Sequence, residues 1–224
     1  MGRGLLIWLG GAVFVAALAY CAYSYAFPWG RTVPFSPMAI AGDGALFTAF
    51  ALHHSLFARD AVKQRMARIV PDAMLRSMYV WVASLLFIAV CAAWRPVGGD
   101  IYHHTGIVAV VHGVLQALGA VIIVQTVRLI DPLELAGIRL HPNADALQIV
   151  GPYRWVRHPI YAGWLLLTFG AAHLTGDRLS FAIISTLYLL IAMPYEERSL
   201  RKSFGDKYEA YCALVRYRLV PYVY

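Results

Sequence analysis

Six long apolar runs constrain this chain more than any other feature of its sequence. They cover about residues 4–27, 39–57, 75–94, 106–130, 158–175 and 179–194. A helix needs roughly 20 apolar residues to cross a bilayer, and somewhat fewer when it packs among other helices. Of the 224 residues 60% are hydrophobic and only 14% are charged, whereas soluble domains carry about 25% charged residues. The sequence therefore predicts an all-α, polytopic integral membrane protein with about six transmembrane helices.

The last two runs are short, and Thr175-Gly176-Asp177-Arg178 between them is typical of a tight turn. We expect them to form a short helical hairpin. Residues 198–215 follow, with an apolar stripe at helical spacing formed by Leu200, Phe204, Tyr208, Tyr211 and Val215. This stripe predicts a C-terminal amphipathic cytoplasmic helix, which would lie on the membrane surface or fold over the hairpin as a lid. A peripheral anchor without a ligand is the alternative.

The basic residues orient the predicted helices. With six spans, all of the 19 lysines and arginines except Arg31, Arg95 and Arg178 fall on one side of the membrane. Positive charge marks the cytoplasmic side, so both termini should be cytoplasmic. The net charge of +7 follows from this bias. It favours anionic membrane lipids as partners, and no nucleic acid is needed to explain it.

Polar side chains cluster at the start of the fifth run, in Gly151-Pro152-Tyr153-Arg154-Trp155-Val156-Arg157-His158-Pro159-Ile160-Tyr161-Ala162-Gly163. Pro159 fits the first turn of a helix, which places Arg157, His158 and Tyr161 on one face. Charged groups at the edge of a membrane helix are costly and usually mark a site. The alternative is structural: Arg157 would reach toward headgroups while His158 caps the helix.

Two adjacent carboxylates, Glu196 and Glu197, follow Met193-Pro194 at the end of the sixth run. Negative charge at a helix C-terminus opposes the helix dipole, so a compensating group is expected. Alternatively, Pro194 ends the membrane helix and the glutamates begin the next one, where acidic residues are favourable.

The second half of the chain resembles the isoprenylcysteine carboxyl methyltransferase family of membrane enzymes. The resemblance rests on Arg157-His158-Pro159-x-Tyr161-x-Gly163, Glu196-Glu197, Gly205-x-x-Tyr208-x-x-Tyr211 and Arg218-x-x-Pro221. It implies that residues 106–224 form the half that binds S-adenosylmethionine, whereas residues 1–105 supply the first three helices. The cofactor-binding residues it implies are Tyr153, Arg157, His158, Tyr161, Gly163, Glu196 and Glu197. It places Arg218 near the reacting groups, although the preceding segment is one residue longer than the family pattern.

The first half narrows the resemblance to the branch that contains nurim and the bacterial methanethiol S-methyltransferases. The motifs are Leu52-His53-His54-Ser55-Leu56-Phe57-Ala58-Arg59, Arg76-Ser77-Met78-Tyr79-Val80, Trp94-Arg95-Pro96-Val97-Gly98 and Asp131-Pro132-Leu133-Glu134-Leu135-Ala136-Gly137. This branch implies the fold and the cofactor, but its members differ in function. The methanethiol S-methyltransferases are enzymes, whereas nurim is known as a nuclear-envelope membrane protein.

His53 and His54 lie about one turn from the cytoplasmic end of the second run, where one of them could contact the acceptor. Adjacent helical residues point about 100° apart, so only one can face a given site. A buried histidine bonded to a neighbouring helix is the alternative. The predicted topology puts His103, His104, His112 and His173 on the opposite side, and their spacing suggests no metal site.

Together these features predict an S-adenosylmethionine-dependent membrane methyltransferase acting on a thiol or carboxylate of a small or lipophilic acceptor. No Gly-x-Gly-x-x-Gly motif follows a strand, which excludes a soluble dinucleotide-fold enzyme. A non-catalytic, nurim-like scaffold and a phospholipid amine methyltransferase are the alternatives.

Overall fold

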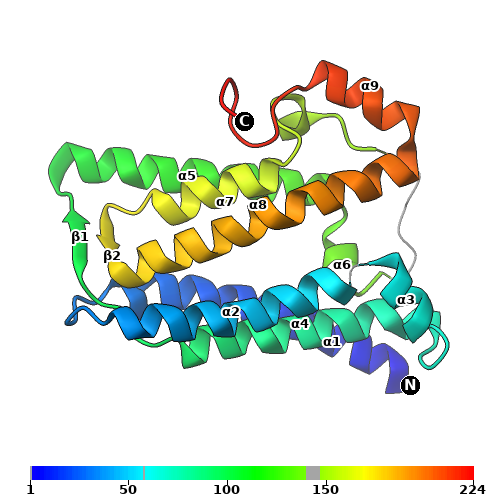
Figure 1. The fold of residues 1–224 in the computed structure, drawn as a ribbon, viewed down its shortest axis with the longest axis horizontal. Coiled ribbons are helices and arrows are strands. Elements are labelled where there is room, and N and C mark those ends of the chain that lie inside the picture. The colour runs from blue at the N-terminus through cyan, green and yellow to red at the C-terminus, as the bar shows by residue number, and fades with distance from the viewer. Residues whose placement is uncertain (1, 58, 140–146) are drawn as a thin grey trace. The chain divides into compact units, whose positions relative to one another are not determined.

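The computed structural model describes residues 2–57, 59–139 and 147–224, and most of these residues are helical (Figure 1). The helices are α1 (Gly2–Ala26), α2 (Pro37–Phe57), α3 (Asp60–Met66), α4 (Asp72–Ala93), α5 (Gly106–Leu129), α6 (Pro132–Leu135), α7 (Pro159–Phe169), α8 (Gly176–Phe204) and α9 (Asp206–Leu214). Two 3-10 helices, η1 (Pro28–Gly30) and η2 (Gly151–Arg154), and two strands, β1 (Asp100–His103) and β2 (His173–Thr175), complete the elements.

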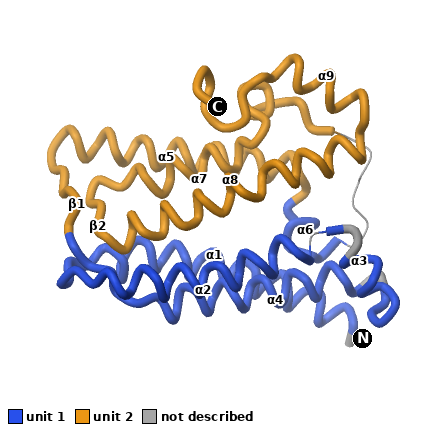
Figure 2. The backbone as a smooth tube through the Cα atoms, in the orientation of Figure 1, with its two compact units in different colours: residues 1–99, 132–142 blue, residues 100–131, 143–224 orange. Residues whose placement is uncertain are grey.

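The chain forms two compact units, which Figure 2 colours separately. Unit 1 contains residues 1–99 and 132–142, and unit 2 contains residues 100–131 and 143–224. The segment that carries α6 therefore returns to unit 1 after α5 has been completed in unit 2.

In unit 1, α4 packs against both α1 and α2. The indole rings of Trp29 and Trp94 lie 5.0 Å apart and pack together just beyond α1 and α4. Asp43 of α2 is fully buried and accepts a 2.9 Å hydrogen bond from the backbone N–H of Arg95, two residues after α4. A buried carboxylate requires such a donor, so this bond ties α2 to the end of α4.

The α6 segment is fastened to α4 within unit 1. Arg76 donates a 2.8 Å hydrogen bond from Nε to the backbone carbonyl of Glu134, and its Nη2 lies 3.6 Å from the Glu134 carboxylate. Gly137 has a φ of 68°, and a Cβ there would meet Val80 Cγ2 at 2.8 Å. Glycine is needed at this position both for the backbone conformation and for the close approach to α4.

In unit 2, α7 packs against both α5 and α8. α5 and α7 approach each other closely at a pair of glycines: a Cβ on Gly163 would lie 2.7 Å from the carbonyl oxygen of Gly119, and a Cβ on Gly119 would lie 2.6 Å from that of Gly163. Membrane helices commonly use small residues in this way, because close backbone packing replaces the hydrophobic driving force between them.

A two-stranded sheet, absent from the all-α prediction, precedes α5 and α8. β1 and β2 pair antiparallel, with Tyr102 opposite Leu174 and His103 opposite His173. The fifth helix therefore ends at Phe169 instead of continuing to 175. Hydropathy does not reveal this end, because the apolar run continues into a strand whose backbone is satisfied by β1.

The sixth helix is longer than predicted. α8 has 29 residues, from Gly176 to Phe204, and the expected turn at 175–178 is its N-terminus, where Thr175 Oγ1 accepts a hydrogen bond from the N–H of Arg178. Pro194 lies inside this helix, so the interpretation that Pro194 ends it is wrong, and both glutamates belong to α8. A proline removes one helical hydrogen bond, but a helix with enough other bonds and packing can accommodate it.

Four helices, α1, α4, α5 and α8, are long and apolar enough to cross a membrane, and α7 is a shorter apolar helix. Large apolar side chains on α5 are exposed, including Ile107, Val110 and Val114, which are 75%, 59% and 61% exposed. An apolar surface of this kind is expected where a helix faces lipid. The chain is therefore a helical, polytopic integral membrane protein.

Candidate functional site

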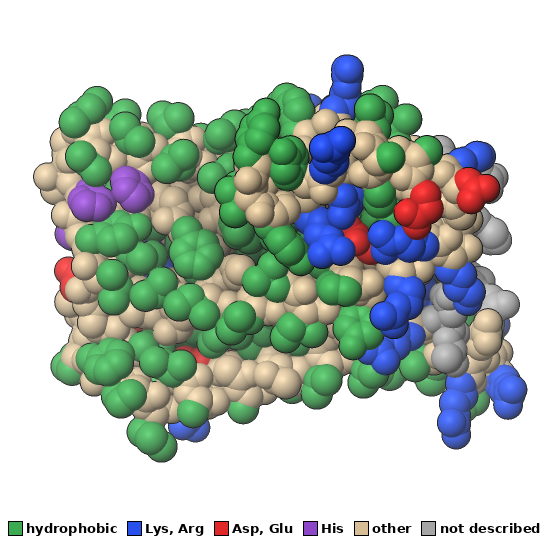
Figure 3. All heavy atoms as spheres, turned by 45° about the horizontal axis from the view of Figure 1, so that its top comes forward, with side chains coloured by type: hydrophobic (Ala, Val, Ile, Leu, Met, Phe, Trp, Pro, Cys, Tyr) green, Lys and Arg blue, Asp and Glu red, His purple; other side chains and the backbone are tan. Residues whose placement is uncertain are grey.

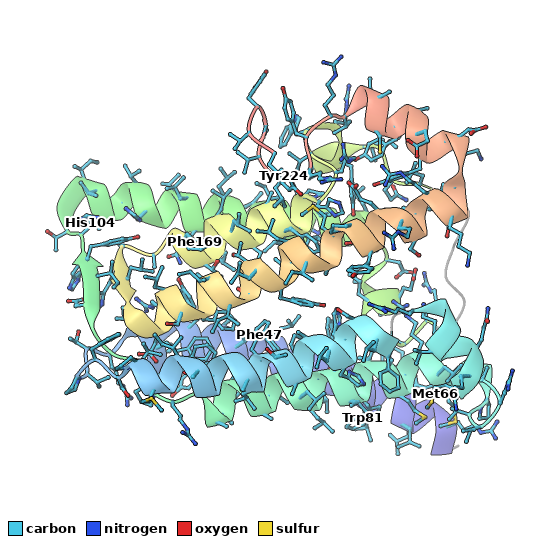
Figure 4. All side chains as sticks on the ribbon, viewed as in Figure 1. Phe47, Met66, Trp81, His104, Phe169 and Tyr224 are labelled. Carbon is cyan, nitrogen blue, oxygen red and sulfur yellow. The ribbon has the colours of Figure 1, made fainter. Side chains whose placement is uncertain are left out.

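The chain entering α7 is paired with the C-terminal segment. The backbone N–H of Arg157 donates to the carbonyl of Tyr217, and that of His158 donates to the carbonyl of Arg218, each at 2.9 Å. In Figure 4 the labelled Tyr224 lies beside the start of α7, as this pairing requires. The arrangement brings Arg218, more than 50 residues later in sequence, to the arginine and histidine that precede α7.

The carboxylate of Glu197 lies at the centre of this arrangement. Its side chain is fully buried, and it accepts hydrogen bonds from Arg157 Nε to Oε1 (2.8 Å) and from Arg218 Nη2 to Oε2 (3.0 Å). His158 Nε2 lies 3.4 Å from Oε1, and Arg201 Nη1 lies 3.7 Å from Oε2. We call these five residues the Glu197 cluster. It joins the entry to α7, the end of α8 and the C-terminal segment through one buried carboxylate.

Arg157 is also committed to the backbone of the C-terminal segment. Its Nη1 donates to the carbonyl oxygens of Val215 (2.9 Å) and Arg216 (2.7 Å), and its side chain is only 8% exposed. The alternative in which Arg157 extends toward lipid headgroups is therefore wrong. The alternative role of His158 as a side-chain cap is also wrong, since its side chain makes no capping hydrogen bond to α7.

The charges of the Glu197 cluster do not cancel. Arg201 is paired with the exposed Glu209 at 2.8 Å, which leaves Arg157 and Arg218 with the Glu197 carboxylate between them. Two guanidinium groups facing one carboxylate attract a further anion. The end of unit 2 that carries α9 shows this mixture of basic and acidic side chains in Figure 3.

Glu196 has a different environment from its neighbour. Its side chain is 48% exposed, and its Oε2 accepts a 2.7 Å hydrogen bond from the hydroxyl of Tyr161. His158 Nδ1 lies 3.6 Å from the same oxygen, and the rings of His158 and Tyr161 are stacked, 5.3 Å apart and 15° from parallel. Glu196 therefore presents a carboxylate that a polar ligand can reach, whereas Glu197 is enclosed.

The stripe predicted for residues 198–215 is buried within unit 2. Tyr208, Tyr211 and Val215 form a core, against which Tyr153 and four other partly buried residues pack: Leu147, Leu200, Phe204 and Cys212. The helix breaks at Gly205, so the stripe spans the end of α8 and all of α9. Burial raises the pKa of the Tyr211 phenol, which therefore stays protonated and donates a 2.8 Å hydrogen bond to the backbone carbonyl of Tyr153.

Seven of the ten predicted site residues lie around this end of unit 2, whereas Gly163 lies farther along α7 and the two histidines belong to unit 1. Gly163 lies against α5, so the close approach it permits is to the Gly119 backbone. His53 and His54 lie in α2 of unit 1, where the hydroxyl of Tyr79 is 2.6 Å from His54 Nδ1. Their proposed role on the acceptor therefore remains a prediction.

Sequence reasoning missed two residues that the structure makes important. Arg201 is four residues after Glu197 on the same helix, a spacing that signals an ion pair. Tyr79 gave no such signal, because its partner His54 lies 25 residues away on a different helix. Among the described residues, no group of three histidine, cysteine, aspartate or glutamate side chains could hold a metal ion.

Comparison with known proteins identifies the family to which the chain belongs. Residues 107–207 match the family model described as phospholipid methyltransferase. Over its whole length the chain is 31% identical to a methanethiol S-methyltransferase of Crocosphaera subtropica, covering 94% of that protein. This chain belongs to the isoprenylcysteine carboxyl methyltransferase-like membrane enzymes, in the branch with nurim and the methanethiol S-methyltransferases.

Two further relatives support the same placement. A methanethiol S-methyltransferase of Mycobacterium tuberculosis is 31% identical, with 94% of each chain covered. Nurim of Xenopus laevis is 28% identical over 66% of this chain and 57% of its own. No solved structure matches the chain. The chain is thus a membrane methyltransferase, which requires a methyl donor and a methyl acceptor.

Proposed function

We propose that this methyltransferase uses S-adenosylmethionine from the cytoplasm to methylate the sulfur of a small thiol. The observation that carries the cofactor assignment is the Glu197 cluster, where Arg157 and Arg218 share one buried carboxylate. An amino-acid carboxylate is the anion that such a pair would take. S-adenosylmethionine supplies an activated methyl group when it is bound.

The other residues of this end of unit 2 suit the remaining parts of the cofactor. The half-exposed carboxylate of Glu196 can accept hydrogen bonds from ribose hydroxyls, and the Tyr161 hydroxyl beside it holds that carboxylate in place. A sulfonium is favoured near tyrosine faces, and Tyr153 lies in η2 while Tyr161 lies in the first turn of α7. Glu197 is the positioning residue that holds Arg157 and Arg218.

A small thiol is the acceptor we favour, because the relatives that match most of the chain are named for methanethiol. A phospholipid amine is the second candidate, since the matching family model is described by phospholipid methylation. The reaction needs an acceptor aligned with the methyl group and protected from water, which is mainly a matter of positioning. Purified protein with radiolabelled S-adenosylmethionine and either methanethiol or phosphatidylethanolamine would separate the two.

The cofactor assignment is tested by titrating the purified protein with S-adenosylhomocysteine in a calorimeter. Replacing Arg218 by alanine should weaken binding by roughly ten- to a hundredfold, the effect of one charge-assisted contact. Arg216→Ala is the matched control, since the structure uses the backbone carbonyl of Arg216 and exposes its side chain. Equal affinities in the two variants would show that the cofactor does not bind at the Glu197 cluster.

We also propose that the chain crosses the membrane six times, with both termini in the cytoplasm. α2 and α7 would add two spans to the four that length and hydropathy support. This topology places the Glu197 cluster on the cytoplasmic side, where the cofactor is available.

A further inference from the structure

The two arginines that bind Glu197 differ in how much of each guanidinium group is open to a ligand. Arg157 is nearly buried, and it donates from Nε to Glu197 and from Nη1 to two carbonyl oxygens of the C-terminal segment. The side chain of Arg218 is 30% exposed, and it donates to Glu197 from Nε (3.3 Å) and from Nη2 (3.0 Å). The bonds to Glu197 do not use Arg218 Nη1. Arg218 is therefore the more accessible of the two for a carboxylate that arrives from solvent.

Tyr224 occupies this accessible part of Arg218. Arg218 Nη1 donates a 2.9 Å hydrogen bond to the hydroxyl oxygen of Tyr224. The centroid of the Tyr224 ring lies 5.4 Å from Cζ of the same guanidinium group, within the range of a cation–π contact. Figure 4 labels Tyr224 at this place, beside the start of α7. One side chain of the C-terminal segment thus covers the part of Arg218 that Glu197 does not bind.

Main-chain hydrogen bonds hold the backbone of Tyr224 in place. Three consecutive N–H groups, those of Arg218, Leu219 and Val220, donate to the main-chain oxygen of Tyr224 at 2.9, 2.8 and 3.1 Å. Successive N–H groups that converge in this way form a nest, a concavity that binds oxygen atoms carrying negative charge. The carbonyl of Val220 in turn accepts from the N–H groups of Val223 (3.1 Å) and Tyr224 (3.0 Å). The side chain of Tyr224 can therefore rotate away from Arg218 while its backbone stays fixed.

The side chain of Tyr224 is held less firmly than its backbone. Tyr224 is 45% exposed, and water weakens both hydrogen bonds and cation–π contacts at exposed positions. An ionised carboxylate also makes a shorter and stronger hydrogen bond to a guanidinium group than a neutral phenol does. A ligand carboxylate can therefore replace the Tyr224 hydroxyl at Arg218 with a net gain in binding free energy.

We propose that Tyr224 is an internal competitor of the methyl donor, and that the amino-acid carboxylate of the donor replaces the Tyr224 hydroxyl at Arg218 Nη1. This inference rests on the proposed use of S-adenosylmethionine. In the empty site the phenol is the partner of Arg218, and in the occupied site the Tyr224 ring turns toward solvent. Tyr224 then weakens the binding of every ligand that places a carboxylate on Arg218, because such a ligand binds only the fraction of molecules in which Tyr224 has moved away. A ligand without that carboxylate is not affected.

The test titrates the purified full chain in a calorimeter with S-adenosylhomocysteine and with its decarboxylated analogue, which lacks only the carboxylate. Tyr224→Phe removes the competing hydroxyl and should raise the affinity for S-adenosylhomocysteine about threefold, the effect of one exposed hydrogen bond. Tyr224→Ala also removes the ring contact and should raise that affinity about five- to tenfold. The affinity for the decarboxylated analogue should stay at the wild-type value in both variants.

Tyr222→Phe is the matched control, because it removes one hydroxyl from the same segment, at a residue that is 88% exposed and whose ring contacts Tyr217. It should bind both ligands as the wild type does. The inference is overturned if the Tyr224 variants bind S-adenosylhomocysteine no more tightly than Tyr222→Phe, or if both ligands gain affinity equally. Weaker binding in Tyr224→Ala would overturn it as well, since Tyr224 would then hold the donor. A wild-type protein that binds the two ligands equally would instead refute the proposed carboxylate site at the Glu197 cluster.

Discussion

At the scale of single residues, two adjacent glutamates in α8 have opposite environments. Glu197 is enclosed by arginines from two other segments, whereas the side chain of Glu196 is half exposed beside Tyr161. A fully buried carboxylate stabilises the fold only while its cationic partners remain in place. We therefore expect mutations of the two residues to separate stability from ligand binding.

Replacing Glu197 by glutamine should destabilise the protein by about 3–5 kcal/mol, since Arg157 and Arg218 lose their shared buried counter-charge. The midpoint of thermal unfolding in detergent measures the change. Glu209→Gln is the matched control: Glu209 also pairs with an arginine, but it is 58% exposed, so a loss of no more than about 1 kcal/mol is expected. Equal shifts in the two variants would show that burial of the Glu197 carboxylate has little energetic weight.

Replacing Glu196 by glutamine should leave the unfolding midpoint nearly unchanged but weaken S-adenosylhomocysteine binding about tenfold, the effect of one charge-assisted hydrogen bond of roughly 1.5 kcal/mol. The reason is that its exposed carboxylate can bond ligand hydroxyls, while Tyr161 remains to hold the amide. Calorimetric titration gives the affinity. Wild-type affinity in this variant would exclude Glu196 from the cofactor.

Spacing alone could predict part of this site. Arg201 follows Glu197 by one helical turn, and this spacing indicates their contact. The expected helix face shared by Arg157, His158 and Tyr161 is not formed, because α7 begins at Pro159 and both Arg157 and His158 precede it. Spacing could not predict that Arg218 and the carbonyls of Val215 and Arg216 meet the same carboxylate, because those contacts depend on how a non-helical tail folds back.

At the scale of elements, the contact between α5 and α7 depends on Gly119 and Gly163. Replacing Gly163 by alanine places a Cβ 2.7 Å from the carbonyl of Gly119. We expect a loss of about 1–3 kcal/mol from overpacking, measured as a lower unfolding midpoint. Gly113→Ala in α5 is the matched control, because a Cβ there meets nothing within 4 Å. A helical alanine should be neutral or stabilising at that position, so a similar loss in both variants would refute the packing role.

Hydropathy identified the apolar helices well but not where they end. α1, α4 and α5 follow their apolar runs closely. α7 stops six residues early because the backbone turns into β2, and α8 continues past Pro194 because its polar end is held by the Glu197 cluster. In both cases a tertiary contact, which a local pattern does not contain, decided the boundary.

At the scale of the whole molecule, the division into two units differs from a simple cut of the sequence. The expected boundary at 105/106 followed the motifs, whereas the structure separates the units at 99/100 and returns residues 132–142 to unit 1. The sequence motif from Asp131 to Gly137 gave no indication of this return. Residues 132–142 belong to unit 1 because Glu134 and Gly137 contact Arg76 and Val80 of α4.

The six-span topology predicts which positions can be labelled from each side of the membrane. Single cysteines at Arg31 and Asp100, in a background without the native cysteines, should react only with reagent on the non-cytoplasmic side. Single cysteines at Lys63 and Lys207 should react only from the cytoplasm. All four positions are exposed in the structure. Labelling of positions 31 and 207 from the same side would exclude the odd number of spans that the topology puts between them, and with it the shared location of the termini.

Pro194 interrupts α8 between its apolar part and the turns that carry Glu197 and Arg201. Because proline has no N–H to donate to the carbonyl of Leu190, the helix bends more easily there than elsewhere along its length. A transmembrane helix responds to a change in bilayer thickness by tilting or kinking. When the apolar part of α8 tilts, the helix then bends at Pro194 and the position of Glu197 does not change. Turnover should accordingly vary little with lipid acyl-chain length, and replacing Pro194 by alanine should make the enzyme sensitive to it.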